Sequence, residues 1–350
     1  MKTIRVQFPN YGYDIVIDRG SLSRIGEFVH AKGKQVMIVT DDHVAPLYLQ
    51  TVVQSLQRAG LQTHSLTLPS GEPTKRFDML PVIYDALIAA GLTRSDCMLA
   101  LGGGVIGDIT GFAAATYLRG IDYYQVPTSL LAQVDSSVGG KVAVDLPQGK
   151  NLVGQFYQPK GVWIDVEVLQ TLPDLFFRDG MGEVIKYGCI CDRDLFENLR
   201  AYGGKQGVYE HMEEIVATCC DIKRRIVEQD EKDLGQRMLL NFGHTYGHAL
   251  EKYYNYCGLT HGQAVAIGMY RVTQLTQAQG LTAEGTLEQL GEVLRMYGLP
   301  MQDPTDPATV ARCAMTDKKH FGNRLMAVIL KQIGESCLYP TDADFFAREV

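Results

Sequence analysis

The sequence predicts a mixed α/β domain with a mainly parallel sheet, followed by a domain built of helices. In the first half of the chain, short apolar runs alternate with helical patterns, as they do in βαβ units. From about Leu175, helical patterns follow one another without intervening strands. The 350 residues also exceed what a single hydrophobic core usually supports. We therefore expect two domains, residues 1–172 and 173–350.

Each expected strand of the first domain is a short apolar run bounded by glycine, proline or polar residues. The first nine residues alternate apolar and polar side chains, which is typical of an edge strand. Buried strands are expected at residues 36–40, 97–101 and 123–126, and a further strand at residues 61–68. Helices are expected between them, at residues 44–59, 77–90 and 109–117. Strands joined by crossover helices pair in parallel.

Five helical patterns make up the expected second domain. They cover residues 176–199, 208–228, 239–256, 263–278 and 287–297. Consecutive helices without strands between them pack into an all-helical domain.

The composition is that of an ordinary globular protein, with 46% hydrophobic and 21% charged residues. The 33 basic and 40 acidic side chains give a net charge of −7, which disfavours binding to nucleic acid or anionic membranes. The N-terminus lacks the apolar core of a signal peptide, and no apolar run reaches the ~18 residues of a membrane span. The eight cysteines show no C-x-x-C spacing, which counts against a structural zinc site. We expect a cytoplasmic protein with a small anionic ligand.

A glycine-rich turn, Gly102-Gly-Gly-Val-Ile-Gly107-Asp108, lies between an expected strand and an expected helix. Its spacing satisfies G-x-G-x-x-G, in which bare backbone approaches a pyrophosphate at a helix amino terminus. The match follows a late strand, and Asp122 comes ~15 residues later rather than ~20. A tight turn that needs glycine is the alternative. Asp108 would contact a ribose or amide, or cap the helix.

Two further segments combine glycine with lysine. The stretch from Pro127 to Lys141 joins hydroxyls, the Asp135 carboxylate, paired glycines and a lysine, and Gly149-Lys150-Asn151 repeats the theme. Glycines before a lysine can form a backbone nest beside an ammonium group, which suits phosphate. The alternative is that both are surface turns with solvated lysines.

Three of the eight histidines, His244, His248 and His261, lie in one short stretch. His244 and His248 are four residues apart on an expected helix, and this spacing nominates both as metal ligands. Upstream, Glu183 and Lys186 offer a carboxylate and an ammonium group one helical turn apart. Two imidazoles and a carboxylate form a common catalytic zinc set, although a single histidine is more often structural or solvated. We expect a metal-assisted enzyme.

The following motifs occur in order: GGGVIGD, AATYLRG, VPTSLLAQVDSSVGGK, GKNLVGQFYQP, EVIKYG, RMLLNFGHTYGHALE and HGQAVAIGM. Together they resemble the 3-dehydroquinate synthase family of the shikimate pathway over roughly residues 36–334. The resemblance implies a Rossmann-like NAD-binding domain before a helical metal- and substrate-binding domain. It also implies conversion of 3-deoxy-D-arabino-heptulosonate 7-phosphate to 3-dehydroquinate and phosphate. The implied steps are transient oxidation by NAD+, phosphate elimination, reduction and intramolecular aldol closure.

The same resemblance implies the catalytic groups. The metal ligands, for Zn2+ or Co2+, are Glu183, His244 and His261. The catalytic side chains that face the substrate are Asp135, Lys186, Asn241 and His248. His248 is then a polar contact or a proton-transfer group, and no longer the ligand that its spacing suggests.

Binding residues are carried over by the same motifs. Lys223 and Arg237 match a pair that holds the substrate carboxylate. The phosphate contacts are Lys141, Asn151 and one of Lys318 or Lys319. Arg119 matches an arginine that reaches the phosphate from a neighbouring subunit, which implies a homodimer. The expected NAD contacts are Ser70, Gly71, Glu72, Pro73, Thr74, Lys75, Gly102, Gly103, Gly104, Val105, Ile106, Gly107, Asp108, Thr128, Ser129, Lys141, Lys150, Val168, Leu169, Gln170 and Thr171.

The chain departs from the frequent family pattern at a few positions. Gln263 stands where the family motif HGE has glutamate, beside an implied ligand, so the charge around the metal differs. Ser70 stands where an acid is common, and His43 where many members have asparagine.

Three other functions compete with this interpretation. A different sugar-phosphate cyclase would accept a substrate without the carboxylate, against which the retained SSVGGK stretch, Lys223 and Arg237 argue. A metal-dependent alcohol dehydrogenase of related fold would produce NADH. A non-catalytic sensor would bind NAD or metal without turnover.

Overall fold

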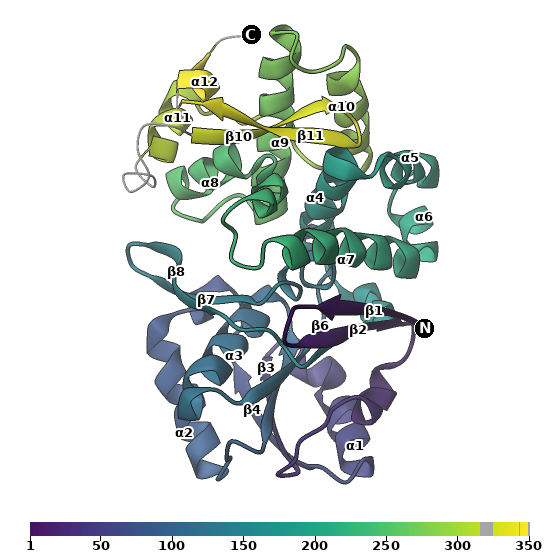
Figure 1. Cartoon of the computed structure of the whole chain (residues 1–350), viewed down its shortest axis with the longest axis vertical. Coiled ribbons are helices and arrows are strands. Elements are labelled where there is room, and N and C mark those ends of the chain that lie inside the picture. The colour runs from purple at the N-terminus through teal and green to yellow at the C-terminus, as the bar shows by residue number, and fades with distance from the viewer. Residues whose placement is uncertain (316–324, 343, 349–350) are drawn as a thin grey trace. The chain divides into compact units, whose positions relative to one another are not determined.

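A computed structural model describes residues 1–315, 325–342 and 344–348 of the chain (Figure 1). Packing divides the chain into two units. Unit 1 comprises Met1–Pro173 and Lys223–Glu228, and unit 2 comprises Asp174–Ile222 and Gln229–Val350. That residues 1–172 and 173–350 are the two domains of the protein stays a prediction. Within the described part of the chain, no helix is long and apolar enough to cross a membrane.

Unit 1 is built on a seven-stranded sheet with the strand order β1-β2-β9-β6-β5-β3-β4. In chain order the strands are β1 (Lys2–Gln7), β2 (Gly12–Asp18), β3 (Gln35–Asp41), β4 (Gln62–Leu68), β5 (Cys97–Gly102), β6 (Asp122–Pro127) and β9 (Gly161–Asp165). β1 pairs antiparallel with β2, and the other neighbours pair in parallel. The mainly parallel sheet is confirmed, and the N-terminal strand lies at its edge.

Helices connect the parallel strands as the sequence predicts. They are α1 (Gln50–Arg58), α2 (Leu80–Ala89) and α3 (Gly104–Thr116). α3 begins in the glycine-rich turn itself, before the predicted start at residue 109. Glycine has a poor helix propensity, so a helix that begins at Gly104 is not expected from the sequence. Where two glycine–lysine turns are predicted, β7 (Lys141–Leu146) and β8 (Gly149–Phe156) form an antiparallel hairpin.

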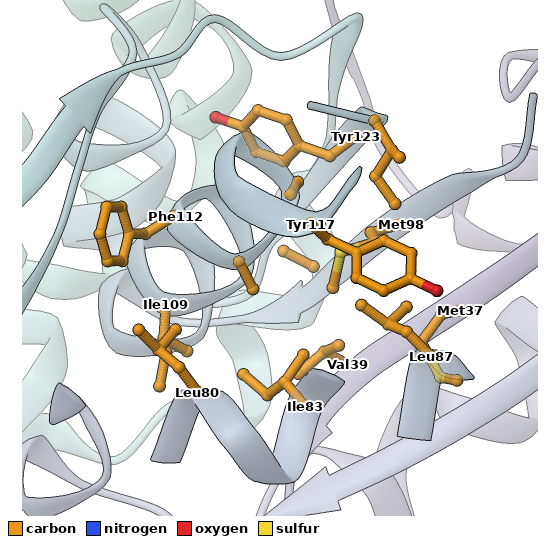
Figure 2. Close-up of a cluster of buried hydrophobic side chains, with 14 of the residues drawn as sticks. Met37, Val39, Leu80, Ile83, Leu87, Met98, Ile109, Phe112, Tyr117 and Tyr123 are labelled. Carbon is orange, nitrogen blue, oxygen red and sulfur yellow. The ribbon is translucent and has the colours of Figure 1, made fainter. Parts of the chain in front are cut away.

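Side chains of the central strands alternate between two hydrophobic cores. Met37, Val39 and Met98 pack on one face of the sheet with apolar side chains of α2 and α3, such as Ile83 and Ile109 (Figure 2). The intervening residues of β3 and β5 belong to a second cluster, together with side chains of α1. Burial on both faces explains why these strands read as continuous apolar runs in the sequence.

Unit 2 is mainly helical, as predicted. Its helices are α4 (Asp174–Cys191), α5 (Arg193–Tyr202), α6 (Lys205–Glu210), α7 (Met212–Gln229), α8 (His244–Tyr253), α9 (His261–Ala278), α10 (Thr286–Met296), α11 (Pro307–Met315) and α12 (Asp344–Ala347). The last turns of α7, Lys223–Glu228, are grouped with unit 1.

Two predicted helices are each broken in the structure. The pattern at residues 176–199 is divided at Asp192, whose carboxylate accepts a hydrogen bond from the Leu195 N–H and caps α5. The pattern at residues 208–228 is divided at His211, between α6 and α7. The predicted helix 239–256 begins only at His244, because residues 236–241 form a 3-10 turn.

The prediction of an all-helical second domain omits a β-hairpin. β10 (Leu325–Gln332) and β11 (Glu335–Thr341) pair antiparallel, and β10 packs on α9. Residues 327–330 form a short, fully apolar and buried run. Such a run does not distinguish a strand from a helix by periodicity alone.

Glycines bring α9 into close contact with α4 and α8. A Cβ atom added to Gly262 of α9 would lie 2.0 Å from the carbonyl oxygen of Asp179 in α4. A Cβ added to Gly268 of α9 would lie 2.0 Å from the carbonyl oxygen of Gly243, which precedes α8. The helices therefore approach backbone to backbone. This brings the middle of α4 and the first residues of α8 and α9 close together.

We predict that Gly262→Ala destabilises unit 2, because the added methyl group must push α9 away from α4. Overpacking of this kind costs about 1–3 kcal/mol of the free energy of unfolding, which urea denaturation measures. Gly291→Ala in α10 is the matched control, since its Cβ would meet only side-chain atoms, at 3.2 Å and 3.4 Å. Equal losses of stability in both variants would contradict the close contact.

Candidate active site

Three of the predicted metal ligands come together in unit 2. Glu183 lies within α4 and is fully buried, while His244 and His261 are the first residues of α8 and α9. The Nε2 atoms of His244 and His261 lie 3.4 Å and 3.5 Å from Oε1 of Glu183. One ligand atom from each residue can be chosen so that all three lie within 4.8 Å of one another. A single cation can therefore contact all three side chains.

Each of these imidazole rings is held through its other nitrogen. Nδ1 of His244 lies 3.1 Å from the carbonyl oxygen of Phe242. Nδ1 of His261 lies 3.5 Å from Oε2 of Glu251, a buried carboxylate of α8. A proton on Nδ1 of His244 leaves its Nε2 lone pair on the side of Glu183, and the same holds for His261 once its Nε2 proton has left. One carboxylate and two imidazole nitrogens in buried surroundings fit a divalent metal of the zinc type.

The two histidines differ in charge when no metal is bound. Burial lowers the pKa of His244 to about 3, so its ring is neutral. Burial also opposes the charged form of His261, but hydrogen bonds to Glu183 and Glu251 outweigh it and raise the pKa to about 10. His261 then carries a positive charge between the two carboxylates. A divalent cation would replace that charge and release the proton.

Two of the other predicted catalytic residues of unit 2, Lys186 and His248, contact acidic residues of this cluster. Lys186 is buried and forms an ion pair with Oε2 of Glu183. The His248 side chain is 55% exposed, and its Nε2 atom lies 4.0 Å from Oε2 of Glu251. The group of ligand atoms that includes Glu183 and His244 is completed by His261 and not by His248. Asn241 is exposed and ends the 3-10 turn before α8.

A loop fixed by Asp230 places Arg237. The Asp230 carboxylate accepts backbone N–H groups of Leu234, Gly235 and Arg237 at 2.7–3.1 Å. The buried Arg237 guanidinium donates to the carbonyl oxygen of Glu231 at 2.7 Å. Burial opposes the charged form of Asp230, but the N–H groups and Arg237 outweigh it and lower the pKa of the carboxyl group.

In unit 1, most of the predicted NAD contacts follow the carboxyl ends of four parallel strands, whereas Lys141 and Lys150 lie in the antiparallel hairpin of β7 and β8. Residues 70–75 follow β4, residues 102–108 end β5 and begin α3, and residues 128–129 follow β6. Residues 168–171 belong to a 3-10 turn after β9. Carboxyl ends of parallel strands lie at one edge of a sheet, where α/β folds bind their ligands. The structure thus places these segments along a common edge.

Contacts within unit 1 join several of these segments. Lys75 Nζ lies 2.5 Å from Oδ2 of Asp108, and Lys150 Nζ lies 3.4 Å from Oε1 of Glu72. The Asp108 carboxylate therefore pairs with a lysine, and burial raises its pKa although Lys75 opposes this. A Cβ atom added to Gly103 would lie 3.3 Å from Oγ of Ser129. A side chain at Gly103 would crowd Ser129, so the close approach of these two segments favours glycine.

Four predicted substrate contacts, Asp135, Lys141, Asn151 and Lys223, belong to unit 1. Oδ1 of Asp135 lies 2.9 Å from Nζ of Lys223, which also donates to the Asp135 carbonyl oxygen at 2.7 Å. Lys141 begins β7 and is exposed. Asn151 in β8 has a left-handed φ of 57°, and its N–H donates to Asp145 at 2.8 Å.

Arg119 and the C-terminal lysines are placed differently. Arg119 is exposed, and it ends a 3-10 turn with a left-handed φ of 69°. The predicted phosphate contacts Lys318 and Lys319 lie outside the described residues.

The sequence interpretation missed two acidic residues beside the ligands. Oδ1 of Asp179 accepts the Gly262 N–H at 2.5 Å and fixes the start of α9. Glu251 contacts His261. The position of Glu251, seven residues after His244 and three after His248, places all three on one helix face and was the available signal.

Two family models match consecutive parts of the chain: 3-dehydroquinate synthase N-terminal at residues 65–179, and 3-dehydroquinate synthase C-terminal at residues 180–320. A 3-dehydroquinate synthase of Clostridium beijerinckii is 49% identical over 99% of this chain and 100% of its own length.

Solved structures of two other synthases share the fold. A 2-deoxy-scyllo-inosose synthase, complexed with carbaglucose-6-phosphate, NAD+ and Co2+, is 24% identical with a TM-score of 0.90, covering 99% of this chain and 98% of its own. A 2-epi-5-epi-valiolone synthase of Streptomyces hygroscopicus, with NAD+ and Zn2+ bound, is 25% identical with a TM-score of 0.88, covering 97% and 96%.

We predict that Asp230→Asn lowers stability at neutral pH but not in acid. Because the pKa of Asp230 is lowered from 3.8, its ionised form stabilises the folded chain above about pH 4. That contribution is lost as the pH falls through the folded-state pKa, where the wild-type carboxylate is protonated. The free energy of unfolding of both proteins, measured by denaturation from pH 7 down to pH 3, checks this. A difference that does not change with pH would contradict a role for the charge.

Proposed function

The chain belongs to the 3-dehydroquinate synthase family, and we propose that it converts 3-deoxy-D-arabino-heptulosonate 7-phosphate to 3-dehydroquinate and phosphate. The observation that carries the proposal is the convergence of Glu183, His244 and His261, in a chain that is alike over its whole length to enzymes of that name. NAD+ and a divalent metal are its cofactors, and the cytoplasm is its site of action.

Glu183, His244 and His261 would hold the metal, which is Zn2+ or Co2+. When bound, a divalent metal stabilises a developing alkoxide and orients the hydroxyl groups of the sugar. The buried Lys186 pairs its ammonium group with the second oxygen of the Glu183 carboxylate. The Phe242 carbonyl oxygen faces Nδ1 of His244 and so leaves its Nε2 atom available.

The carboxyl edge of the unit 1 sheet would bind NAD+. When bound, NAD+ would supply reversible hydride transfer, so that the reaction has no net oxidation. The glycines at the start of α3 allow the backbone N–H groups to reach a pyrophosphate. The Lys75–Asp108 pair joins the loop of residues 70–75 to this turn, and the Lys150–Glu72 pair joins the same loop to β8.

The charged residues would bind the two ends of the substrate. We assign Lys223 and Arg237 to its carboxylate, and Asp135 orients the Lys223 ammonium group at 2.9 Å. Lys141, Asn151 and one of Lys318 or Lys319 are assigned to the phosphate. The exposed ring of His248 can move a proton at the reacting hydroxyl. Arg119 would complete the phosphate site of a neighbouring subunit, and the protein would be a homodimer.

Two alternatives differ in their products. An alcohol dehydrogenase of related fold would accumulate NADH, and a sensor would bind metal and NAD without releasing phosphate. A related cyclase would not require the substrate carboxylate.

We predict that the protein, supplied with NAD+ and Zn2+ or Co2+, releases phosphate from the heptulosonate phosphate without accumulation of NADH. A phosphate-release assay with absorbance at the NADH band measures both products in one reaction. Chelation should stop release, and added metal should restore it. Steady growth of NADH, or no phosphate release by metal-loaded protein, would contradict the proposal.

We predict that His261→Ala loses metal binding and activity, whereas Arg119→Ala mainly binds its substrate more weakly. Loss of a metal ligand should abolish metal binding and activity together. Loss of the guanidinium should mainly raise KM, because it binds phosphate and not the reacting atoms. Arg119→Lys is the matched control and should retain part of the affinity.

Subunit mixing tests the proposed origin of Arg119. If Arg119 acts in its neighbour's site, a mixed dimer of the two alanine variants contains one site with both residues intact. Co-refolding the two variants should therefore restore activity above that of either alone. No recovery in verified mixed dimers would place Arg119 in its own subunit's site.

A further inference from the structure

We propose that Glu251 is a positioning residue of the metal centre, whose carboxylate holds the His261 ring so that Nε2 faces Glu183. The inference rests on the metal site of the proposed function. Glu251 has no ligand role in that site, and its part is to fix the tautomer, orientation and basicity of a ligand.

The His261 ring lies between two buried carboxylates. Its Nε2 atom is 3.5 Å from Oε1 of Glu183, and its Nδ1 atom is 3.5 Å from Oε2 of Glu251. The side chains of Glu183 and Glu251 are 0% and 6% exposed. Each nitrogen therefore faces its own carboxylate, and the two contacts fix the plane of the ring.

An ionised carboxylate can only accept hydrogen bonds. Glu251 therefore requires a proton on Nδ1 of His261, which leaves the Nε2 lone pair for a cation. A carboxylate behind an imidazole also makes it a stronger donor to metal. His244 is different, because its Nδ1 faces the neutral carbonyl oxygen of Phe242. Glu251 thus gives one of the two histidine ligands a charged support that the other lacks.

The fold leaves Glu251 little freedom to move away. It lies on the buried side of α8, and a Cβ added to Gly247, one turn earlier, would lie 2.9 Å from the carbonyl oxygen of Ala264 in α9. The start of α9 is fixed independently by a capping box between Thr260 and Gln263. Burying a carboxylate is costly unless it meets a partner, and here that partner is a ligand.

A competing arrangement uses Glu251 as a ligand. His248, Glu251 and His261 also offer ligand atoms within 4.8 Å of one another. However, Glu251 faces His261 through Nδ1, so a cation there would compete with the proton that directs Nε2 to Glu183. The His248 side chain is also 55% exposed, whereas the set containing Glu183 is buried. The geometry favours Glu251 as a support behind the metal.

Cobalt binding to the full-length protein tests this role without measuring turnover. Metal-free wild type, Glu251→Gln, Glu251→Asp and His248→Gln are titrated with Co2+ against a competing chelator, and visible spectra report the coordination. Glu251→Gln should bind Co2+ about 10–100-fold more weakly, with the spectrum of the wild type. His248→Gln should keep the wild-type affinity. Glu288→Gln, on the exposed side of α10, is the control for loss of one negative charge.

The outcomes separate this inference from the proposed function. Wild-type affinity in Glu251→Gln would overturn the positioning role. A changed spectrum in Glu251→Gln, or equal weakening by His248→Gln, would show Glu251 to be a ligand and would also overturn it. If Glu251→Gln does not fold, Glu251→Asp replaces it in the test. This variant keeps the negative charge but places it farther from His261, and its affinity for Co2+ should fall less than that expected for Glu251→Gln. Failure of the wild type to bind Co2+ would instead contradict the proposed function.

Discussion

The burial of Glu183 is the interaction on which the rest of the site depends. Its carboxylate is fully buried in α4, where an ionised group is stable only if positive charge compensates it. Lys186 supplies one such charge, one helical turn away. The charged His261 supplies the second when no metal is bound. A divalent cation is a stronger replacement for that proton, which is why this arrangement suits a metal.

Close helix packing makes this charge cluster possible. Gly262 and Gly268 let α9 approach the backbone of α4 and of the residue before α8, because a Cβ atom at either position would lie 2.0 Å from a carbonyl oxygen. Two ligands are the first residues of their helices, so their positions follow directly from how α8 and α9 begin. In unit 1, the loops that follow the parallel strands come from distant parts of the sequence. They lie at one edge of the sheet because the strands run in the same direction.

The buried parallel strands of unit 1 were predicted correctly from the hydrophobic pattern of the sequence. The continuous apolar runs at residues 36–40 and 97–101 are β3 and β5, because burial on both faces of a parallel sheet produces such runs. Periodicity did not reveal β10, whose apolar run is too short to distinguish from a helix, nor the break at Asp192.

In the candidate site, too, residue spacing predicted only part of the arrangement, and helix packing determines the rest. Spacing alone paired His244 with His248, since residues four apart share a helix face. The partner that the fold provides is His261 on the next helix, a proximity that depends on how α8 and α9 pack. Motif resemblance found His261, but neither spacing nor motif gave Glu251 a role. That role follows from a contact between helices.

Anomalous diffraction from zinc-loaded crystals would test the central claim most directly. We expect one zinc ion within about 2.0–2.2 Å of a Glu183 oxygen and of Nε2 of both His244 and His261. In that position Glu251 would contact the far side of the His261 ring and not the ion. A zinc ion bound by His248 and Glu251, with Glu183 outside its coordination, would contradict the account.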